Sequence, residues 1–295
     1  MRRFDMYIPE DMLDLLEYLD SHQKGVYLMA NGSDLINRIQ RRQVDAKTLV
    51  DLSGLSELNY VRKEDRIIRI GALTTVADIA SSPVMDAHYD VFREVQAKFG
   101  GPSITNMATI GGNICAASSS EDFLPTLLVL DAFVRLRSKQ GERIVRLEDF
   151  LKGKRMLDLR PNEILVETFF NEIDDDSACA FEKMGMRNSM IIAFVSSAVY
   201  VNVSKDSGVA REIRIAFNRV SGKIPARAKH TEDKLRGKKP SVQVIHESLL
   251  MLNSELQLSS DFRASRDYRT HVAGVLFRRA LSKCLHRLTG VNVVV

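Results

Sequence analysis

Two short glycine-containing segments have residue types that suit chemistry. The first, Ala-Asn-Gly-Ser-Asp-Leu at positions 30–35, follows a short apolar run and precedes a helical pattern. The N-terminus of a helix offers unpaired backbone N–H groups and a partial positive charge, and small residues let a phosphate approach them. Ser33 or Asp34 can equally be an ordinary helix N-cap, whose side chain accepts a backbone hydrogen bond. The sequence therefore leaves two interpretations open, a phosphate-binding turn and a capped turn.

The second segment, Thr-Ile-Gly-Gly-Asn at 109–113, closes a stretch from 100 to 113 that holds four glycines and one proline and has little periodicity. Adjacent glycines permit left-handed backbone conformations that can form an anion-binding nest. A loop of this length in a compact domain is usually functional or disordered. Its apolar residues Ile104, Met107 and Ile110 argue against disorder. A plain connecting loop is the alternative interpretation.

No other motif for nucleotide binding, hydrolysis or metal binding is present. The sequence has no GxxxxGK[ST], GxGxxG, GxSxG or HExxH pattern, and its six histidines are scattered singly. Cys115, Cys179 and Cys284 are too few and too far apart for a zinc site or an iron–sulfur cluster held by this chain alone. We therefore expect no metal ligands and no acid–base catalytic residue in this chain.

Composition excludes several further classes of protein. A net charge of +4 and a basic run at 227–239 without Phe, Trp or Tyr do not suit nucleic-acid binding. The longest apolar run, 190–203, is shorter than the roughly 20 residues that a membrane helix needs. The charged start at 1–11 lacks the apolar segment of a secretory signal, and scattered cysteines favour a reducing compartment. We expect a cytoplasmic protein that binds neither membranes nor nucleic acid.

The elements that position the two segments mix helices and strands. Apolar spacing predicts a helix around 12–19, a strand at 26–30 and a second helix from 35. Further predictions are hairpins at 58–70 and 133–147, strands at 164–170, 179–184, 191–203 and 211–218, and helices at 86–99, 123–130 and 265–288. The acidic segment 171–177 marks a boundary. We predict an α+β chain with domains at 1–57, 58–175 and 176–295.

These pieces, in this order, resemble the flavin-binding medium subunit of the molybdenum hydroxylases, a family that includes xanthine, aerobic carbon monoxide and nicotinate dehydrogenases. The family carries AGGTDL-like and GxPQIRNxATIGGN-like segments, where this chain has ANGSDL at 30–35 and GGPSITNMATIGGN at 100–113. Four shorter segments also match in order: an ASPxxDLxP-like segment at 117–125, EIL at Glu163–Leu165, KxGxR at Lys183–Arg187 and SDxRASxxYR at 260–269. The ordered set is more specific than any one member.

The resemblance implies FAD as the cofactor. It also implies an FAD-binding region of two α+β subdomains, of the PCMH type found in vanillyl-alcohol oxidase-like flavoproteins. An α+β C-terminal domain with a small antiparallel sheet and helices would follow. By this resemblance, the backbones of 30–34 and 111–113 would hold the FAD diphosphate, and Asp122 would accept hydrogen bonds from hydroxyl groups. Leu165 would pack near the adenine or the flavin, and Lys183 would lie near the isoalloxazine.

The full set of cofactor-binding residues that the resemblance implies is Leu28, Ala30, Asn31, Gly32, Ser33, Asp34, Leu35, Thr109, Ile110, Gly111, Gly112, Asn113, Ser118, Asp122, Leu165 and Lys183. Three departures from the family stand out. Asn31 replaces the first glycine of AGG, Ser119 replaces a common proline, and Ser103 and Thr105 replace the Gln and Arg of PQIRN. Asn tolerates the left-handed region, so the turn at Asn31 can survive. Asn31 can also weaken the phosphate cradle or supply a side-chain donor.

The function that the resemblance implies is that of an electron-transfer subunit in a hetero-oligomeric molybdenum hydroxylase. A small subunit would carry [2Fe–2S] clusters, and a large subunit would carry molybdopterin and hydroxylate a small heterocycle, such as a purine or a nicotinate-like compound. This subunit would pass the electrons through FAD to NAD, a quinone or another acceptor. The alternatives are a stand-alone FAD-dependent oxidoreductase of related fold and a structural component that has lost FAD.

Overall fold

The computed structural model describes residues 3–186, 192–218, 225–258 and 260–290. The chain divides into two compact units, which we describe separately. Unit 1 comprises residues 1–84, 101–117 and 132–170, and unit 2 comprises residues 85–100, 118–131 and 171–295. Two segments that the sequence places in the middle of the chain, 85–100 and 118–131, therefore pack with the C-terminal part. The three-part division at residues 57 and 175 stays a prediction.

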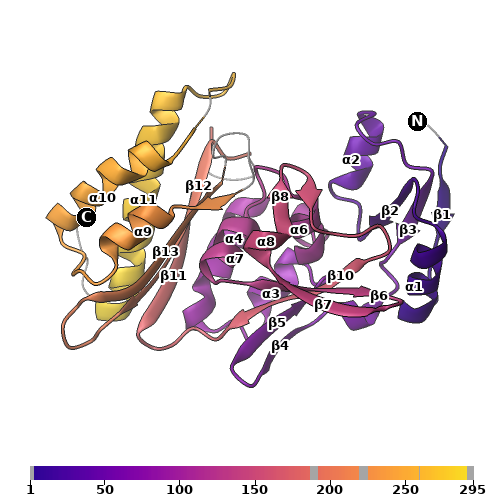
Figure 1. The fold of residues 1–295 in the computed structure, drawn as a ribbon, viewed down its shortest axis with the longest axis horizontal. Coiled ribbons are helices and arrows are strands. Elements are labelled where there is room, and N and C mark those ends of the chain that lie inside the picture. The colour runs from indigo at the N-terminus through magenta and orange to yellow at the C-terminus, as the bar shows by residue number, and fades with distance from the viewer. Residues whose placement is uncertain (1–2, 187–191, 219–224, 259, 291–295) are drawn as a thin grey trace. The chain divides into compact units, whose positions relative to one another are not determined.

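The first part of unit 1 is a small parallel sheet with two helices (Figure 1). The strand order is β1-β3-β2, with bounds Asp5–Tyr7, Thr48–Asp51 and Val26–Met29. Asp11 caps helix α1 (Met12–Ser21), because its side chain accepts a hydrogen bond from the Asp14 N–H. The helix buries the predicted apolar stripe, and α2 (Leu35–Gln40) follows β2. The predictions for α1, β2 and α2 are confirmed, and β1 was not predicted.

The second part of unit 1 is a five-stranded sheet in the order β4-β5-β10-β6-β7. The bounds are β4 Val61–Glu64, β5 Ile67–Gly71, β10 Ile164–Asn171, β6 Phe133–Ser138 and β7 Gly141–Arg146. Both predicted hairpins form, β4 with β5 and β6 with β7. β10 pairs antiparallel with β6, and its register shifts between Leu165 and Glu167.

Short elements connect these strands. They are the 3₁₀ helix Ser56–Leu58, α3 Val76–Ser81, α5 Pro102–Thr105, α6 Ile110–Ala116, α8 Leu147–Phe150, β8 Leu151–Gly153 and β9 Met156–Leu157. The prediction of an irregular loop over 100–113 is therefore wrong in part, because α5 and the start of α6 lie within it. Pro102 stands in the first turn of α5, where its missing N–H costs nothing. Thr109 caps α6, so the glycine pair lies in the first turn of a helix.

Unit 2 is an antiparallel sheet with helices on both faces. Its strands are β11 Ser177–Met184, β12 Val195–Val203, β13 Ala210–Asn218 and β14 Ala226–Arg227, in that order across the sheet. Helices α9 Lys229–Leu235, α10 Val242–Glu255 and α11 Arg266–Thr289 cover one face, and α4 Asp90–Phe99 and α7 Phe123–Val129 cover the other (Figure 1). A short 3₁₀ helix, Ala87–Tyr89, precedes α4.

Because helices cover both faces, the central strands are buried along nearly their whole length. Eight of the nine residues of β12 are buried, which is the pattern of a sheet buried on both sides. The strand predicted at 191–203 begins at Val195, and residue 191 lies outside the described residues. None of the helices in the described parts is long and apolar enough to cross a membrane.

Candidate functional site

The first loop, which we define as residues 30–35, turns the chain from β2 into α2. Gly32 has a φ of +75°, and a Cβ atom added there would lie 2.8 Å from Ile36 Cγ1. Glycine adopts this conformation without strain. Asn31 is not among the described residues with positive φ. The left-handed conformation of the turn therefore belongs to Gly32, and the turn needs no second glycine at position 31.

The polar side chains of the first loop bind other parts of the chain. Asn31 Nδ2 donates a hydrogen bond to Met107 O at 3.0 Å, so Asn31 is a side-chain donor whose acceptor lies within the protein. Asp34 stands at the N-cap position of α2, but its side chain makes no capping hydrogen bond. Its carboxylate instead lies 3.7 Å from the Arg38 guanidinium and 3.4 Å from that of Arg155. Capping therefore does not explain the polar residues of this loop.

The backbone of the first loop offers donors. The N–H groups of residues 31–34 have no acceptor among the residues that the structure describes. Successive backbone N–H groups around a turn with a left-handed residue are suited to an anion. The first loop thus has the unpaired N–H groups that its sequence predicts.

The second loop, residues 109–113, differs from the first because its donors are already used. The N–H groups of residues 110–113 donate within the protein, over distances between 2.9 and 3.1 Å. Their acceptors are, in order, Thr74 O, Ala72 O, Thr109 Oγ1 and Thr109 O. The N–H groups of residues 110–113 are therefore not free, although the family resemblance implies that the backbone of 111–113 holds the diphosphate.

The two glycines of the second loop have different surroundings. A Cβ atom at Gly111 would lie 2.7 Å from Ala72 O and 2.8 Å from Ala72 Cβ, so the segment around Ala72 packs directly against this glycine. A Cβ atom at Gly112 would approach only Thr109 Oγ1, at 3.0 Å. Gly111 is buried and Gly112 is exposed. Gly111 thus permits close packing of the chain, and Gly112 leaves room beside it.

A cavity of about 330 Å³ lies next to the second loop within unit 1. This volume is at the lower end of the range for small-molecule sites and suits one part of a dinucleotide. Six of the predicted residues line it: Leu28, Ala30, Thr109, Gly111, Gly112 and Leu165. The other lining residues are mainly apolar and include Leu19, Val26, Tyr27, Leu52, Ala72, Leu73, Cys115, Leu157, Leu159, Arg160, Pro161, Glu163 and Ile164. The fold thus gathers residues from six separate segments of the sequence around one apolar space.

A buried ion pair fixes the wall of the cavity before β10. Glu163 is 4% exposed and accepts two hydrogen bonds from Arg143, at 2.7 and 2.8 Å, and one from the Arg160 N–H at 2.8 Å. Burial alone would raise the pKa of Glu163, but these hydrogen bonds together hold it below its usual value. Bidentate contacts of this kind restrict geometry strongly. Glu163 therefore holds the turn that leads to Ile164 and Leu165.

Three predicted residues, Ser118, Asp122 and Lys183, belong to unit 2. Ser118 Oγ lies 3.0 Å from Ser120 Oγ and accepts a hydrogen bond from the Ser120 N–H. Asp122 Oδ2 lies 2.5 Å from Lys183 Nζ, and each side chain is 5% exposed. Burial raises the pKa of Asp122 to about 6, although the charge of Lys183 opposes this shift.

One oxygen of Asp122 remains unused. Lys183 engages Asp122 Oδ2 and also donates to Lys98 O at 2.9 Å. Asp122 Oδ1 has no hydrogen-bond partner in the described part of the chain. Arg187, the last residue of the KxGxR segment, lies outside the described residues.

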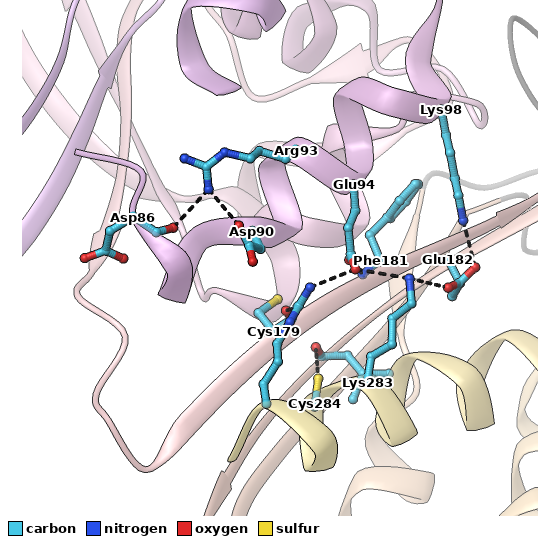
Figure 2. A network of polar contacts seen from close by, with 12 residues as sticks. Asp86, Asp90, Arg93, Glu94, Lys98, Cys179, Phe181, Glu182, Lys283 and Cys284 are labelled. Atoms are coloured by element: carbon cyan, nitrogen blue, oxygen red, sulfur yellow. Dashed lines mark hydrogen bonds and ion pairs between the residues drawn. The ribbon is translucent and has the colours of Figure 1, made fainter. Parts of the chain in front are cut away.

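A network of ion pairs holds the elements around Lys183 together (Figure 2). Glu94 on α4 accepts hydrogen bonds from the Phe181 N–H, Arg287 and Lys283, and Lys283 also pairs with Glu182 at 2.6 Å. Lys98 contacts Glu182 from α4 at 2.7 Å. The network joins α4, β11 and α11, so the strand that carries Lys183 is fixed from both sides.

Two further residues, Cys115 and Arg155, lie near the loops and are not among the predicted site residues. Cys115 lines the cavity, and burial raises the pKa of its thiol to about 12. Arg155, in the β8–β9 connection, contacts both Asp34 and Ala116 O. The position of Cys115 two residues after the glycine-rich pentapeptide was a usable signal. No local sequence signal points to Arg155, because its partners Asp34 and Ala116 are far away in the sequence. Among the described residues, no group of three or more His, Cys, Asp or Glu residues could hold a metal ion.

Comparison with known proteins gives two family matches. The family described as "FAD binding domain in molybdopterin dehydrogenase" matches residues 2–170, and "CO dehydrogenase flavoprotein C-terminal domain" matches residues 180–284. The nicotinate dehydrogenase FAD-subunit of Eubacterium barkeri is 29% identical over 98% of this chain and 99% of its own length. The carbon monoxide dehydrogenase medium chain of Hydrogenophaga pseudoflava is 26% identical over 95% of this chain and 96% of its own length.

Solved structures agree with these matches. The structure of reconstituted CO dehydrogenase from Oligotropha carboxidovorans gives a TM-score of 0.92 at 26% identity, over 97% of this chain and 99% of that chain. The predicted fold, an FAD-binding region followed by a C-terminal domain of a sheet and helices, is confirmed.

Proposed function

The chain belongs to the family of FAD-binding domains of molybdopterin dehydrogenases, and we propose that it is the electron-transfer subunit of a multi-subunit molybdenum hydroxylase. The observation that carries the proposal is the cavity of unit 1, which gathers six residues that the family resemblance implies as FAD-binding. When bound, FAD takes up and releases electrons. In this proposal, the substrate reacts on another subunit of the complex.

The residues of unit 1 fit a bound dinucleotide in two ways. The N–H groups of residues 31–34 are directed to no acceptor within the described chain and can donate to the diphosphate. The apolar cavity beside Gly112 and Leu165 can exclude water from a flat ring such as adenine. The role of this chain is to bind and orient the cofactor.

We place Lys183 near the flavin ring, where its charge would favour the reduced cofactor. Lys183→Met should then lower the flavin reduction potential in a redox titration. It should also reduce stability by about 3 kcal/mol, because Asp122 would stay buried without its ion-pair partner. Lys98→Met is the matched control, since it removes a neighbouring lysine that pairs with Glu182 instead. Equal potentials in wild type and Lys183→Met would exclude this role.

We propose that the partners are a small subunit with [2Fe–2S] clusters and a large subunit with molybdopterin. A [2Fe–2S] cluster takes four cysteine ligands, and this chain has three cysteines. The relatives are named as a subunit and a medium chain of larger dehydrogenases. We propose a small heterocycle, purine-like or nicotinate-like, as the substrate of the complex, because two relatives are named as FAD subunits of a nicotinate and a xanthine dehydrogenase. Other relatives are named for carbon monoxide and glyceraldehyde dehydrogenases. All three cysteines carry free thiols, which fits the cytoplasm.

The experiment that tests the proposal is purification of the native protein with its bound partners. We expect a yellow complex that releases FAD on denaturation and contains iron and molybdenum in other chains, as measured by mass spectrometry and metal analysis. A yellow protein that is active without any partner would favour a stand-alone flavin oxidoreductase. Colourless protein that cannot take up added FAD would contradict the cofactor assignment.

A further inference from the structure

The two loops are tied to each other by a side chain that the family resemblance would not place there. Asn31 Nδ2 in the first loop donates to Met107 O, which lies two residues before the second loop, at 3.0 Å. The two residues are 76 positions apart in the sequence. A glycine at position 31, as in AGGTDL, has no side chain with which to make this contact.

Arg155 provides a second tie on the other side of α6. Its guanidinium lies 3.4 Å from Asp34 Oδ2 in the first loop and 3.3 Å from Ala116 O in the last turn of α6. Its own N–H donates to Ala117 O at 2.8 Å. Arg155 has a φ of +57°, a conformation that a residue with a Cβ atom keeps only when its surroundings determine it.

We propose that Asn31 and Arg155 are positioning residues that hold the two loops together as one preassembled cradle for the FAD diphosphate. This inference rests on the proposed function, because it assumes that the first loop receives that diphosphate. Loops that must converge on one ligand lose conformational freedom on binding, and ties that exist beforehand reduce this loss. In this chain, an amide side chain at position 31 thus replaces a glycine and adds a contact between the loops.

The test of the first tie is Asn31→Gly, which restores the glycine of the family segment. We expect the dissociation constant for FAD to rise about fivefold, the factor that corresponds to about 1 kcal/mol for one lost hydrogen bond. The dissociation constant for ADP should rise by the same factor, and that for adenosine, which has no diphosphate, should not change. Asn37→Ala is the matched control, because Asn37 Nδ2 donates to Ser33 O at 2.8 Å without reaching the second loop.

The second tie is tested with Arg155→Met, with Arg38→Met as its control. Both arginines face Asp34, but Arg38 lies on the short helix α2 that directly follows Asp34, whereas Arg155 comes from a distant segment. We expect weaker binding of FAD and ADP in Arg155→Met and little change in Arg38→Met. Should Asn31→Gly fail to fold, Asn31→Ala has the same expected result.

Hydrogen exchange of the FAD-free protein separates this inference from the proposed function. Asn31→Gly should speed the exchange of amides in residues 109–113 as well as in residues 30–35, whereas Asn37→Ala should affect residues near α2 only. Unchanged FAD affinity together with unchanged exchange at 109–113 in Asn31→Gly would overturn the inference and leave the proposed function standing. A wild-type protein that binds neither FAD nor ADP would overturn both.

Discussion

The two glycine-containing loops look alike in the sequence and differ in what their backbones do. The first loop turns at Gly32 with a left-handed conformation and leaves the N–H groups of residues 31–34 without acceptors in the described chain. The second loop starts a helix, uses the N–H groups of residues 110–113 within the protein and packs Gly111 against Ala72. The first loop has unpaired N–H groups that can donate hydrogen bonds, and the second loop allows another segment of the chain to approach closely.

The difference shows that glycine has two separate uses near a ligand. At Gly32 it permits a backbone conformation, and at Gly111 it permits contact with another segment of the chain. Substitutions that add only a methyl group therefore test each use separately. Three such substitutions should differ most in their effects on folding.

Gly111→Ala should have the largest effect on stability. Its methyl group would meet the backbone oxygen of Ala72 at 2.7 Å, and a backbone atom in a sheet-linked segment cannot move away cheaply. Overpacking of this kind lowers the free energy of unfolding by about 1–3 kcal/mol, and we expect the upper end of that range. Chemical denaturation monitored by circular dichroism measures this decrease in the free energy of unfolding.

Gly54→Ala is the matched control for this substitution. A Cβ atom at Gly54 meets nothing within 4 Å, and Gly54 has no positive φ. The Gly54→Ala variant should therefore have the same free energy of unfolding as the wild type. If Gly111→Ala and Gly54→Ala were equally stable, close packing would not be the reason for glycine at position 111.

Gly32→Ala should have an intermediate effect on stability and a larger one on cofactor binding. The left-handed conformation costs a residue with a Cβ atom about 1–2 kcal/mol, and Ile36 must also move. The first loop can relieve this strain by changing its turn, which would redirect the N–H groups of residues 31–34. We expect FAD titration to show weakened binding in a protein that still folds. Normal FAD affinity in this variant would mean that the first loop does not hold the diphosphate.

Much of the fold could be predicted from the sequence because its signals are local. The apolar stripe of α1 and the two hairpins each depend on residues within about one element. The loop predicted over 100–113 was wrong in part because helices as short as α5 and α6 leave almost no periodicity. The pairing of segments 85–100 and 118–131 with unit 2 depends on long-range packing, which no local pattern records.

The candidate site was predictable in its residue types and less so in its contacts. Gly112 and Leu165, two of the residues that the resemblance implies, line the same cavity. The acceptors that occupy the N–H groups of the second loop, Ala72 O and Thr74 O, come from a segment about 40 residues earlier. Asn31 finds its acceptor at Met107 for the same reason, through folding of distant segments. Hydrogen-bond partners at such separations depend on the topology of the fold, and local patterns in a single sequence do not reveal them.

Gly112→Ala should have the smallest effect on stability, although it stands next to Gly111. Its methyl group would approach only Thr109 Oγ1, at 3.0 Å, and alanine is favoured over glycine in a helix by about 1 kcal/mol, so the two effects should nearly cancel. The N–H of residue 112 would stay bonded to Thr109, and the new methyl group would stand in the wall of the cavity. If the second loop acts as a surface, FAD binding should weaken about tenfold, or about 1.4 kcal/mol, while the unfolding curve stays in place. If FAD bound to Gly112→Ala as tightly as to the wild type, the ligand would not approach this glycine, and the first loop alone would form the cradle.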